Sequence, residues 1–323
     1  MLSLFRTNQA YAGLLLFVYA LVLWLPVFFI PDTGMENAAD EGILGKWVVE
    51  ALAGSRILSV LATVILVGIQ GIQLNTWAAR HHVSRSVTQF PGLFLVLVSA
   101  LVFSFHGFSS FQVANVFLLF FLLSLGRLYK REEPAVALFN AGAWLGVASL
   151  FRPEYLLFLP AGVAAISILR RLELRSLLQL LTGVGMVYFF TVVAGYVFAA
   201  PPGTLARHFS GLGFPELMQA GTKDLLGLGL LGLLILAMVL SFGRVNTMLN
   251  IEGSKNVSVL AWLLLCSMLV VAVAAQVSVV NAQVVVVPLG GLLGLRLVTL
   301  PNARAEAIHV VLVAAALIPL ILG

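Results

Sequence analysis

Long apolar stretches alternate with short charged connections along the whole chain, and this alternation restricts the fold more than any other feature. Hydrophobic residues make up 61% of the 323 residues, and charged residues only 10%. Such a chain could not cover its apolar surface in water, whereas a lipid bilayer solvates that surface with hydrocarbon. Backbone groups in lipid must satisfy one another, so the sequence predicts an all-α protein that crosses a membrane many times.

The lengths of the apolar stretches predict about eleven membrane-spanning helices in one membrane domain that covers residues 1–323. The expected spans are 11–30, 57–75, 90–105, 110–126, 135–151, 154–169, 177–200, 224–242, 257–276, 282–299 and 306–322. As a single helix, the stretch 257–299 would be roughly 60 Å long, about twice the hydrocarbon thickness. It therefore has to turn, and the polar run Gln276, Ser278, Asn281 and Gln283 is the expected place.

The positive charges predict the orientation of these spans. If the N-terminus is cytoplasmic and the spans alternate, about 13 of the 18 Lys and Arg residues lie on the cytoplasmic side. Basic residues accumulate in cytoplasmic loops. We therefore expect a cell inner (cytoplasmic) membrane protein with its N-terminus inside and its C-terminus outside. The net charge of +5 follows from this topology, so nucleic acid is not an expected partner.

Two expected outer loops are long enough to hold structure, residues 31–56 and 201–223. In the first, Ile43, Leu44, Trp47, Val48, Ala51 and Leu52 recur at helical spacing. An amphipathic helix of this kind lies along a membrane surface instead of crossing it. The second loop mixes Gly and Pro with Leu, Phe and Met, and we expect it to lie at the same interface.

Asp, Glu, Lys and Arg are missing from the centres of the expected spans. Ion pumps and proton-driven carriers keep such residues for function, so their absence argues against these classes and leaves a facilitator open. The histidines are spread over both sides and the last span, which predicts no shared metal site. His81 and His82 are expected in a solvated loop on the inner side.

Charged residues in the outer connections are the candidates for chemistry. Asp40 and Glu41 precede the surface helix, where they either cap it or act as a general base or cation-binding carboxylate. Arg152 lies in a very short connection, and a fixed guanidinium there suits a phosphate headgroup. Snorkelling, or pairing with Glu154, is the alternative interpretation. Arg207 and His208 are candidates to complete the anion site.

Small residues at four-residue spacing predict close helix contacts. Gly142 and Gly146 form one such pair, and Gly290 and Gly294 form another. The looser set Gly227, Gly229 and Gly232 is interpreted in the same way. Small residues allow helix backbones to approach closely in a membrane. For the mid-span residues Asn115 and Asn140 we expect hydrogen bonds between helices.

Residues 1–200 resemble the conserved seven-span module of the GT-C superfamily of integral-membrane glycosyltransferases. The features that carry the resemblance are the acidic pair Asp40-Glu41, the surface helix, the hairpin 104–109 and Arg152-Pro153 in the stretch 145–160. These enzymes take sugars from polyprenyl-phosphate donors. The resemblance implies that Asp40 or Glu41 is the catalytic base or a metal-associated carboxylate. The chain is also similar to a family of bacterial inner-membrane proteins with the same opening, to which no activity is assigned.

The first hypothesis is therefore a glycosyltransferase that uses a polyprenyl-phosphate-linked sugar on the outer face. Arg152 would bind the donor phosphate, with Arg207 and His208 assisting, and the resemblance allows a divalent cation as cofactor. Residues 201–323 would add the outer loop and four further spans. Two alternatives stay open. One is a non-enzymatic subunit or scaffold that assembles with other envelope proteins, and the other is a facilitator for a lipid or an apolar solute.

Overall fold

The fold is a bundle of helices, which we describe from a computed structural model of the chain. The described residues are 2–6, 11–29, 41–84, 87–129, 134–198, 201, 203–209, 221–246, 249–273 and 278–321. Within these ranges every regular element is a helix, which confirms the predicted all-α class.

The helices follow the apolar stretches of the sequence in order. Their bounds are η1 Leu2–Phe5, α1 Tyr11–Trp24, η2 Leu25–Phe29, α2 Ile43–Ala53, α3 Arg56–Arg80, α4 Phe90–Ser99, η4 Phe103–His106, α5 Ser110–Gly126, α6 Ala135–Phe151, η5 Pro153–Phe158, α7 Leu159–Leu169, α8 Leu174–Val197, α9 Thr204–His208, α10 Thr222–Asn246, α11 Ile251–Val273, η6 Val279–Val285, α12 Val286–Val298 and α13 Asn302–Ile321. The η elements are 3-10 helices.

Five of these helical segments are long and apolar enough to cross a membrane. They are Arg56–Arg80, Leu174–Val197, Lys223–Gly243, Ile251–Val273 and Val279–Val298. A helix lies in each of the other expected ranges, but several of these helices have only 10–17 residues. The described residues are thus compatible with a membrane protein, and the number of eleven spans stays a prediction.

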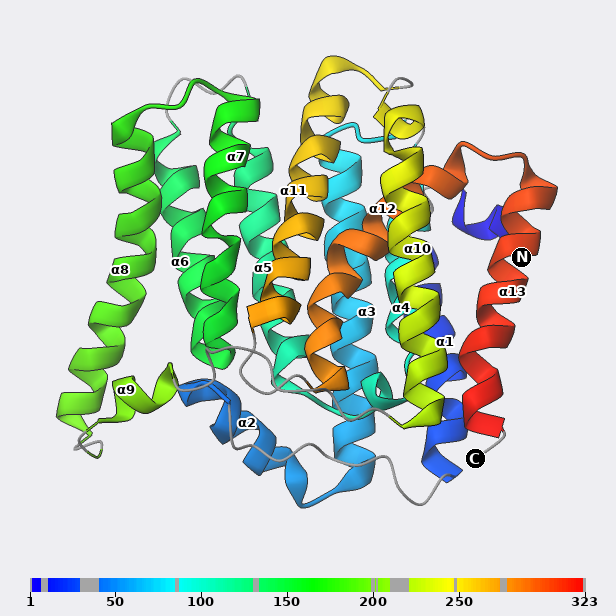
Figure 1. Ribbon diagram of the computed structural model, residues 1–323, viewed down its shortest axis with the longest axis horizontal. Helices are drawn as coiled ribbons and strands as arrows, with labels where there is room; N and C mark the ends of the chain where they lie inside the picture. Colours follow the sequence, from blue (N-terminus) through cyan, green and yellow to red (C-terminus); the bar gives the residue numbers. More distant parts are fainter. Residues whose placement is uncertain are drawn as a thin grey trace.

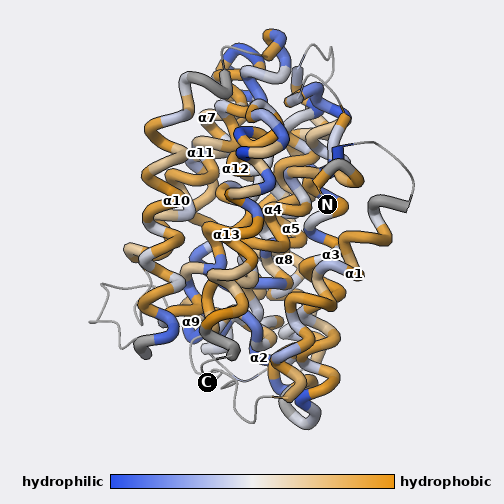
Figure 2. Tube along the Cα trace, turned by 90° about the vertical axis from the view of Figure 1, so that its right-hand side faces the viewer, coloured by the Kyte–Doolittle hydropathy of each residue, from blue (hydrophilic) through white to orange (hydrophobic). Residues whose placement is uncertain are grey.

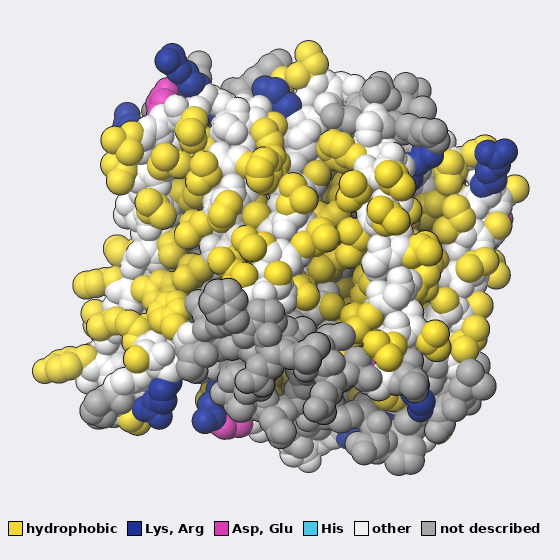
Figure 3. Space-filling model, viewed as in Figure 1, with side chains coloured by type: hydrophobic (Ala, Val, Ile, Leu, Met, Phe, Trp, Pro, Cys, Tyr) yellow, Lys and Arg dark blue, Asp and Glu magenta, His cyan; other side chains and the backbone are white. Residues whose placement is uncertain are grey.

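The long helices run side by side between the two ends of the bundle (Figure 1). We call these the α2 end, where α2 lies across the bundle and α9 lies beside it, and the His81 end opposite. Hydrophobic residues occupy most of the helix lengths (Figure 2). On the face drawn in Figure 3, Lys and Arg lie at the two ends and hydrophobic side chains fill the band between them. This distribution matches a bilayer that surrounds the middle of the bundle.

The predicted break near residue 280 is present, because α11 ends at Val273 and η6 begins at Val279. Asn281 and Gln283 lie in η6 and are buried, while Gln276 lies outside the described residues. The backbone carbonyl of Gln283 accepts a hydrogen bond from the Asn115 amide at 3.1 Å, and Asn115 accepts one from the Tyr155 hydroxyl at 2.7 Å. The prediction that Asn115 bonds between helices is therefore confirmed. A short break in a helix is tolerated here because buried side chains satisfy its backbone.

The two regularly spaced glycine pairs form the expected helix contacts. A Cβ added at Gly142 would meet the carbonyl of Leu180 in α8, and one at Gly146 would press on Val187. Gly290 and Gly294 face the backbone of α4 in the same way, and Gly227 faces Leu101 and Val102. The prediction is wrong for Gly229 and Gly232, because open space surrounds them and no described helix packs there.

Replacing Gly142 by Ala is expected to destabilise the bundle. The new methyl group would collide with the Leu180 carbonyl, which is backbone and cannot rotate away, so α6 and α8 must separate. Overpacking of this kind costs about 1–3 kcal/mol. The thermal midpoint of the detergent-purified protein would report the loss.

Gly185→Ala is the matched control, since Gly185 lies in α8 close to the same contact but faces open space. Alanine favours a helix over glycine by up to about 1 kcal/mol, so this variant should be neutral or stabilised. Equal behaviour of the two variants would show that α6 and α8 are not packed through Gly142.

Candidate functional site

The start of α2 docks on the end of α6 through a close backbone contact. The Gly42 N–H donates a 3.0 Å hydrogen bond to the Phe151 carbonyl. A Cβ at Gly42 would collide with the carbonyls of Leu150 and Phe151, and a Cβ at Gly45 would collide with Phe151 as well. Glycine at both positions thus lets the two segments touch. The contact fixes Glu41, the residue just before Gly42, beside the end of α6.

Arg152 is held at this junction by the proline that follows it. A residue before proline avoids the helical region, so α6 ends at Phe151 and Arg152 is extended. The Arg152 side chain is only 6% exposed, and its guanidinium carbon lies 4.0 Å from the centre of the Phe111 ring. The snorkelling interpretation is therefore wrong. A stacked, buried guanidinium of this kind has one fixed orientation.

Glu41 lies in the electrostatic field of Arg152. Burial raises the pKa of Glu41 above its ordinary value, the positive charge of Arg152 and the nearby Ser110 hydroxyl lower it in part, and the negative charge of Glu154 raises it again. A Cβ at Gly45 would lie 2.9 Å from the Glu41 Oε2 atom, so this carboxylate packs against the first turn of α2. Glu41 does not cap that helix, because the N-cap residue is Gly42. A carboxylate whose pKa is raised towards neutrality is suited to general-base chemistry.

His208 joins α2, α8 and α6 through a directed chain of hydrogen bonds. The Ile43 N–H donates to His208 Nδ1 at 3.3 Å, so Nε2 carries the proton and donates to the Tyr188 hydroxyl at 3.2 Å. The Ser149 hydroxyl donates to the Gly146 carbonyl at 2.7 Å, which leaves the Tyr188 hydroxyl to donate to Ser149 at 2.8 Å. The neutral histidine thus completes an ordered link between the surface elements and the bundle.

The stability of the protein is expected to fall as the pH is lowered from about 6.5 to about 4. Burial lowers the pKa of His208 from 6.5 to about 4. Between these values the unfolded chain binds a proton at this residue and the folded chain does not, so acid favours unfolding. Below about pH 4 both states are protonated and this contribution stops growing. Unfolding midpoints measured across the window, in wild type and in His208→Gln, would test the expectation.

The His208→Gln variant separates this histidine from other titrating groups, because the amide carbonyl of glutamine can still accept from the Ile43 N–H but does not ionise. Its midpoint should depend less on pH than that of wild type. Glu41 contributes with the opposite sign, since its raised pKa makes the folded state lose stability as the pH rises. Identical pH profiles of wild type and variant would contradict a neutral buried His208.

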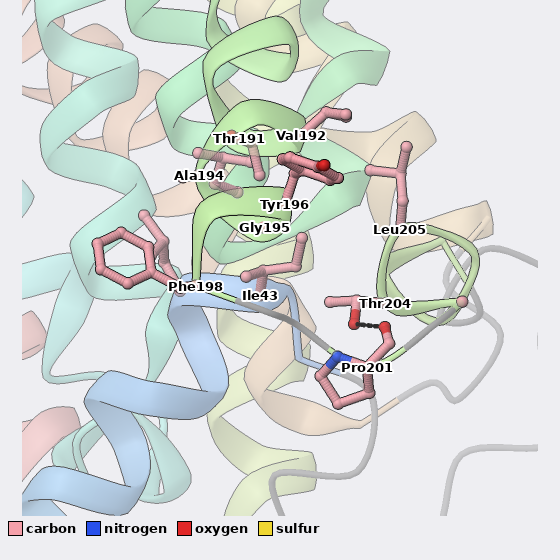
Figure 4. Close-up of a pocket in the computed structure, with 13 residues that line it drawn as sticks. Ile43, Thr191, Val192, Ala194, Gly195, Tyr196, Phe198, Pro201, Thr204 and Leu205 are labelled. Atoms are coloured by element: carbon pink, nitrogen blue, oxygen red, sulfur yellow. Dashed lines mark hydrogen bonds between the residues drawn. The ribbon is translucent and has the colours of Figure 1, made fainter.

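An apolar groove of about 480 Å³ opens beside this junction. Figure 4 shows that its walls come from the last turns of α8, from α9 and from the start of α2. It is lined by Ile43, Leu44, Leu150, Thr191, Val192, Ala194, Gly195, Tyr196, Phe198, Pro201, Gly203, Thr204 and Leu205. The Thr204 hydroxyl is turned away from the ligand space and donates to the Pro201 carbonyl at 2.6 Å. The lining is almost wholly apolar, and Tyr196 at its rim is 89% exposed, so the groove is open to the side.

The groove lies next to the junction of α2 and α6 that holds Glu41 and Arg152. Leu150 in its wall is two residues from Arg152, and Ile43 is two residues from Glu41. The structure thus brings together two of the predicted site residues, with His208 on the other side of Ile43. Arg207 is exposed on α9, and its part in an anion site stays a prediction. Asp40 lies outside the described residues.

Sequence reasoning missed Tyr188 and Ser149, which hold His208, and Phe111, on which Arg152 stacks. The signal for Tyr188 and Ser149 was a hydroxyl group within an apolar helix. That signal does not identify His208 as the partner, because His208 lies in another element. Comparison of the chain with protein-family models, with curated proteins and with solved structures found no match in any of the three.

Proposed function

We propose that this protein transfers a sugar from a polyprenyl-phosphate donor to an acceptor hydroxyl at the membrane surface. The observation that carries the proposal is the buried Arg152 beside the partly buried Glu41, at the edge of an apolar groove. A phosphate attached to a long apolar chain matches this combination of cation and groove. The GT-C resemblance of residues 1–200 favours the same chemistry.

In this proposal each part of the site has one role. The lipid tail occupies the groove, and Arg152 binds the phosphate through parallel N–H groups. Glu41 accepts the proton of the acceptor hydroxyl, whose oxygen forms a bond to the anomeric carbon of the sugar. The bond between that carbon and the phosphate oxygen breaks, and polyprenyl phosphate leaves with its charge beside Arg152. Arg152, whose buried guanidinium stacks on Phe111, is the group to which we assign that charge.

The proposal also fixes the orientation. We place the α2 end on the outer face of the inner membrane, with the N-terminus inside and about eleven spans, because this threading puts most Lys and Arg in cytoplasmic connections. Polyprenyl-linked sugars on the outer face would then reach the groove sideways from the bilayer. A cysteine introduced at exposed Lys46 should react with an impermeant maleimide in intact cells if this orientation is right.

Native mass spectrometry of the purified protein with a series of polyprenyl phosphates tests the donor site. Wild type should retain a polyprenyl phosphate in preference to a polyprenol of the same length, because only the former carries the anion. Ala194→Phe, which narrows the groove, should weaken retention of the lipid while leaving the charged junction intact.

Arg175→Ala is the matched control for charge, since Arg175 is exposed at the start of α8, at the other end of the bundle. It should retain the lipid as wild type does. Equal retention of polyprenyl phosphate and polyprenol would contradict the proposed donor site. A scaffold or subunit would then be the better interpretation, and partners co-purifying with the tagged protein would be the next observation.

A further inference from the structure

Polar side chains recur along one side of α3, interspersed with apolar ones such as Leu74. Thr63, Gln70, Trp77 and His81 recur at spacings of seven and four residues, which places them within roughly 40° of one another on a helix of 3.6 residues per turn. All four are buried. The face covers about 27 Å at 1.5 Å per residue, close to the thickness of a bilayer core. Buried polar residues in a membrane helix face the bundle interior and mark functional paths.

At the α2 end this face is hydrogen-bonded to α5. The Gln70 amide donates to the Gln112 backbone carbonyl at 2.8 Å. The Thr63 hydroxyl lies 3.2 Å from the side-chain oxygen of Gln112. The Gln112 amide group in turn donates to the carbonyls of Phe105 and Gly107. The protein itself therefore satisfies the polar groups in this half.

Towards the His81 end the pattern changes. The amide nitrogen and oxygen of Gln73, the indole nitrogen of Trp77 and the amide oxygen of Asn256 in α11 are buried, and none has a hydrogen-bond partner among the described residues. Trp77 and Asn256 are 0% exposed. By contrast, Asn75 in the same helix is satisfied on both sides, by Gln89 and by the Gly92 N–H.

The two helices that carry these groups run in opposite directions (Figure 1). At their polar ends, His81 Nδ1 lies 3.7 Å from Glu252 Oε1. His81, expected from the sequence in a solvated loop, is in fact buried against this carboxylate. One turn further into the bundle, the next residues on the two helices are Trp77 and Asn256, which therefore lie at the same level.

A second contact bounds this level on the side towards the α2 end. Leu74 in α3 and Leu260 in α11 both approach Gly291 of α12, where an added Cβ would lie 3.5 Å and 2.9 Å from their methyl groups. Trp77 and Asn256 thus lie between a polar contact and an apolar one, and Gln73, four residues before Trp77, lies on the adjoining turn of α3. We call Gln73, Trp77 and Asn256 the Trp77 cluster.

We propose that the Trp77 cluster is a water-binding site inside the bundle. Trp77 and Gln73 offer hydrogen-bond donors, and Gln73 and Asn256 offer acceptors. Because none of these side chains is charged, the cluster suits a neutral molecule that both donates and accepts hydrogen bonds. Buried waters typically make about three hydrogen bonds to groups that would otherwise be unsatisfied. Bound water here would connect the His81–Glu252 contact with the bonded half of the α3 face at Gln70.

Radiolytic hydroxyl labelling read by mass spectrometry tests this site, because bound waters generate radicals next to side chains that bulk solvent cannot reach. Trp24 is the matched internal control. It is also 0% exposed, but its indole N–H donates to the His106 carbonyl at 3.2 Å. Trp77 should be oxidised severalfold faster than Trp24 in the same sample, and Asn256→Leu should slow the oxidation of Trp77 towards that of Trp24.

The thermal midpoint of a Gln73→Leu variant gives a second readout, because it should change in opposite directions for a hydrated and for a dry cluster. If water satisfies the Gln73 amide, leucine expels it and leaves Trp77 and Asn256 unpaired, so the thermal midpoint falls. If the cluster is dry, leucine removes an unsatisfied polar group and the midpoint rises. Equal slow oxidation of both tryptophans, together with a stabilised Gln73→Leu protein, would overturn the proposal.

Discussion

Glu41→Gln should lower the rate of sugar transfer by about 10²–10⁴-fold, the range that a positioned general base contributes. Glutamine has nearly the same shape and still packs against Gly45 and Ser110, but it cannot accept the proton of the acceptor hydroxyl. Because burial raises the pKa of Glu41, wild-type activity should also rise with pH through a value above that of an ordinary Glu. Transfer of a radiolabelled sugar from a polyprenyl-phosphate donor, measured against pH, reports both effects.

Glu50→Gln is the control for this variant, since Glu50 lies on the same helix, α2, and points outwards beside Lys46. It should keep wild-type activity, and both proteins should retain the donor lipid. A Glu41→Gln protein that transfers sugar at the wild-type rate would exclude Glu41 as the base, while leaving the lipid site untouched. Asp40, which shares the prediction, would then be the next residue to vary.

Arg152→Met should abolish selective retention of polyprenyl phosphate over polyprenol and also destabilise the fold. Methionine can still pack on Phe111, but the Glu41 carboxylate loses the cation whose charge offsets its burial. Leaving a buried polar group uncompensated costs about 1–3 kcal/mol, and we expect a loss of this order. Unfolding midpoints and lipid retention, measured on the same preparations, would show both losses.

The double variant Arg152→Met with Glu41→Gln separates the two effects. It removes the Glu41 carboxylate but leaves buried Glu154, so the midpoint should recover in part, whereas phosphate selectivity should stay lost because no cation returns. Recovery of selectivity in the double variant would contradict a phosphate site at Arg152. Failure of the midpoint to recover would instead show that Arg152 stabilises the junction through other contacts.

Much of the fold could be predicted because lipid makes the sequence pattern simple. Apolar stretches mark helices, and the spacing of Ile43, Trp47 and Val48 marked α2 as a separate amphipathic helix. The breaks in the helices were harder. The sequence predicts a turn at Gln283 but not its burial in η6 against Asn115 and Ser109, which only the tertiary structure supplies.

The candidate site could be predicted in part for a similar reason. Glu41 and Arg152 are conspicuous as charges beside apolar stretches, and the structure gathers them at one junction. Tyr188 is one aromatic among many in α8, and its role depends on His208, which lies in another element. The glycines show the same limit, since spacing alone did not separate packed Gly142 from open Gly232.

Because α2 docks through the face that carries Gly42 and Gly45, Trp47 on its opposite face can serve as a fluorescence reporter. The contact with α6 uses backbone at Gly42 and Gly45, and Trp47 takes no part in it. Trp47 is 69% exposed. Its fluorescence, quenched by lipids brominated at known depths, can therefore record how deeply α2 sits in a bilayer while the Glu41 carboxylate remains undisturbed.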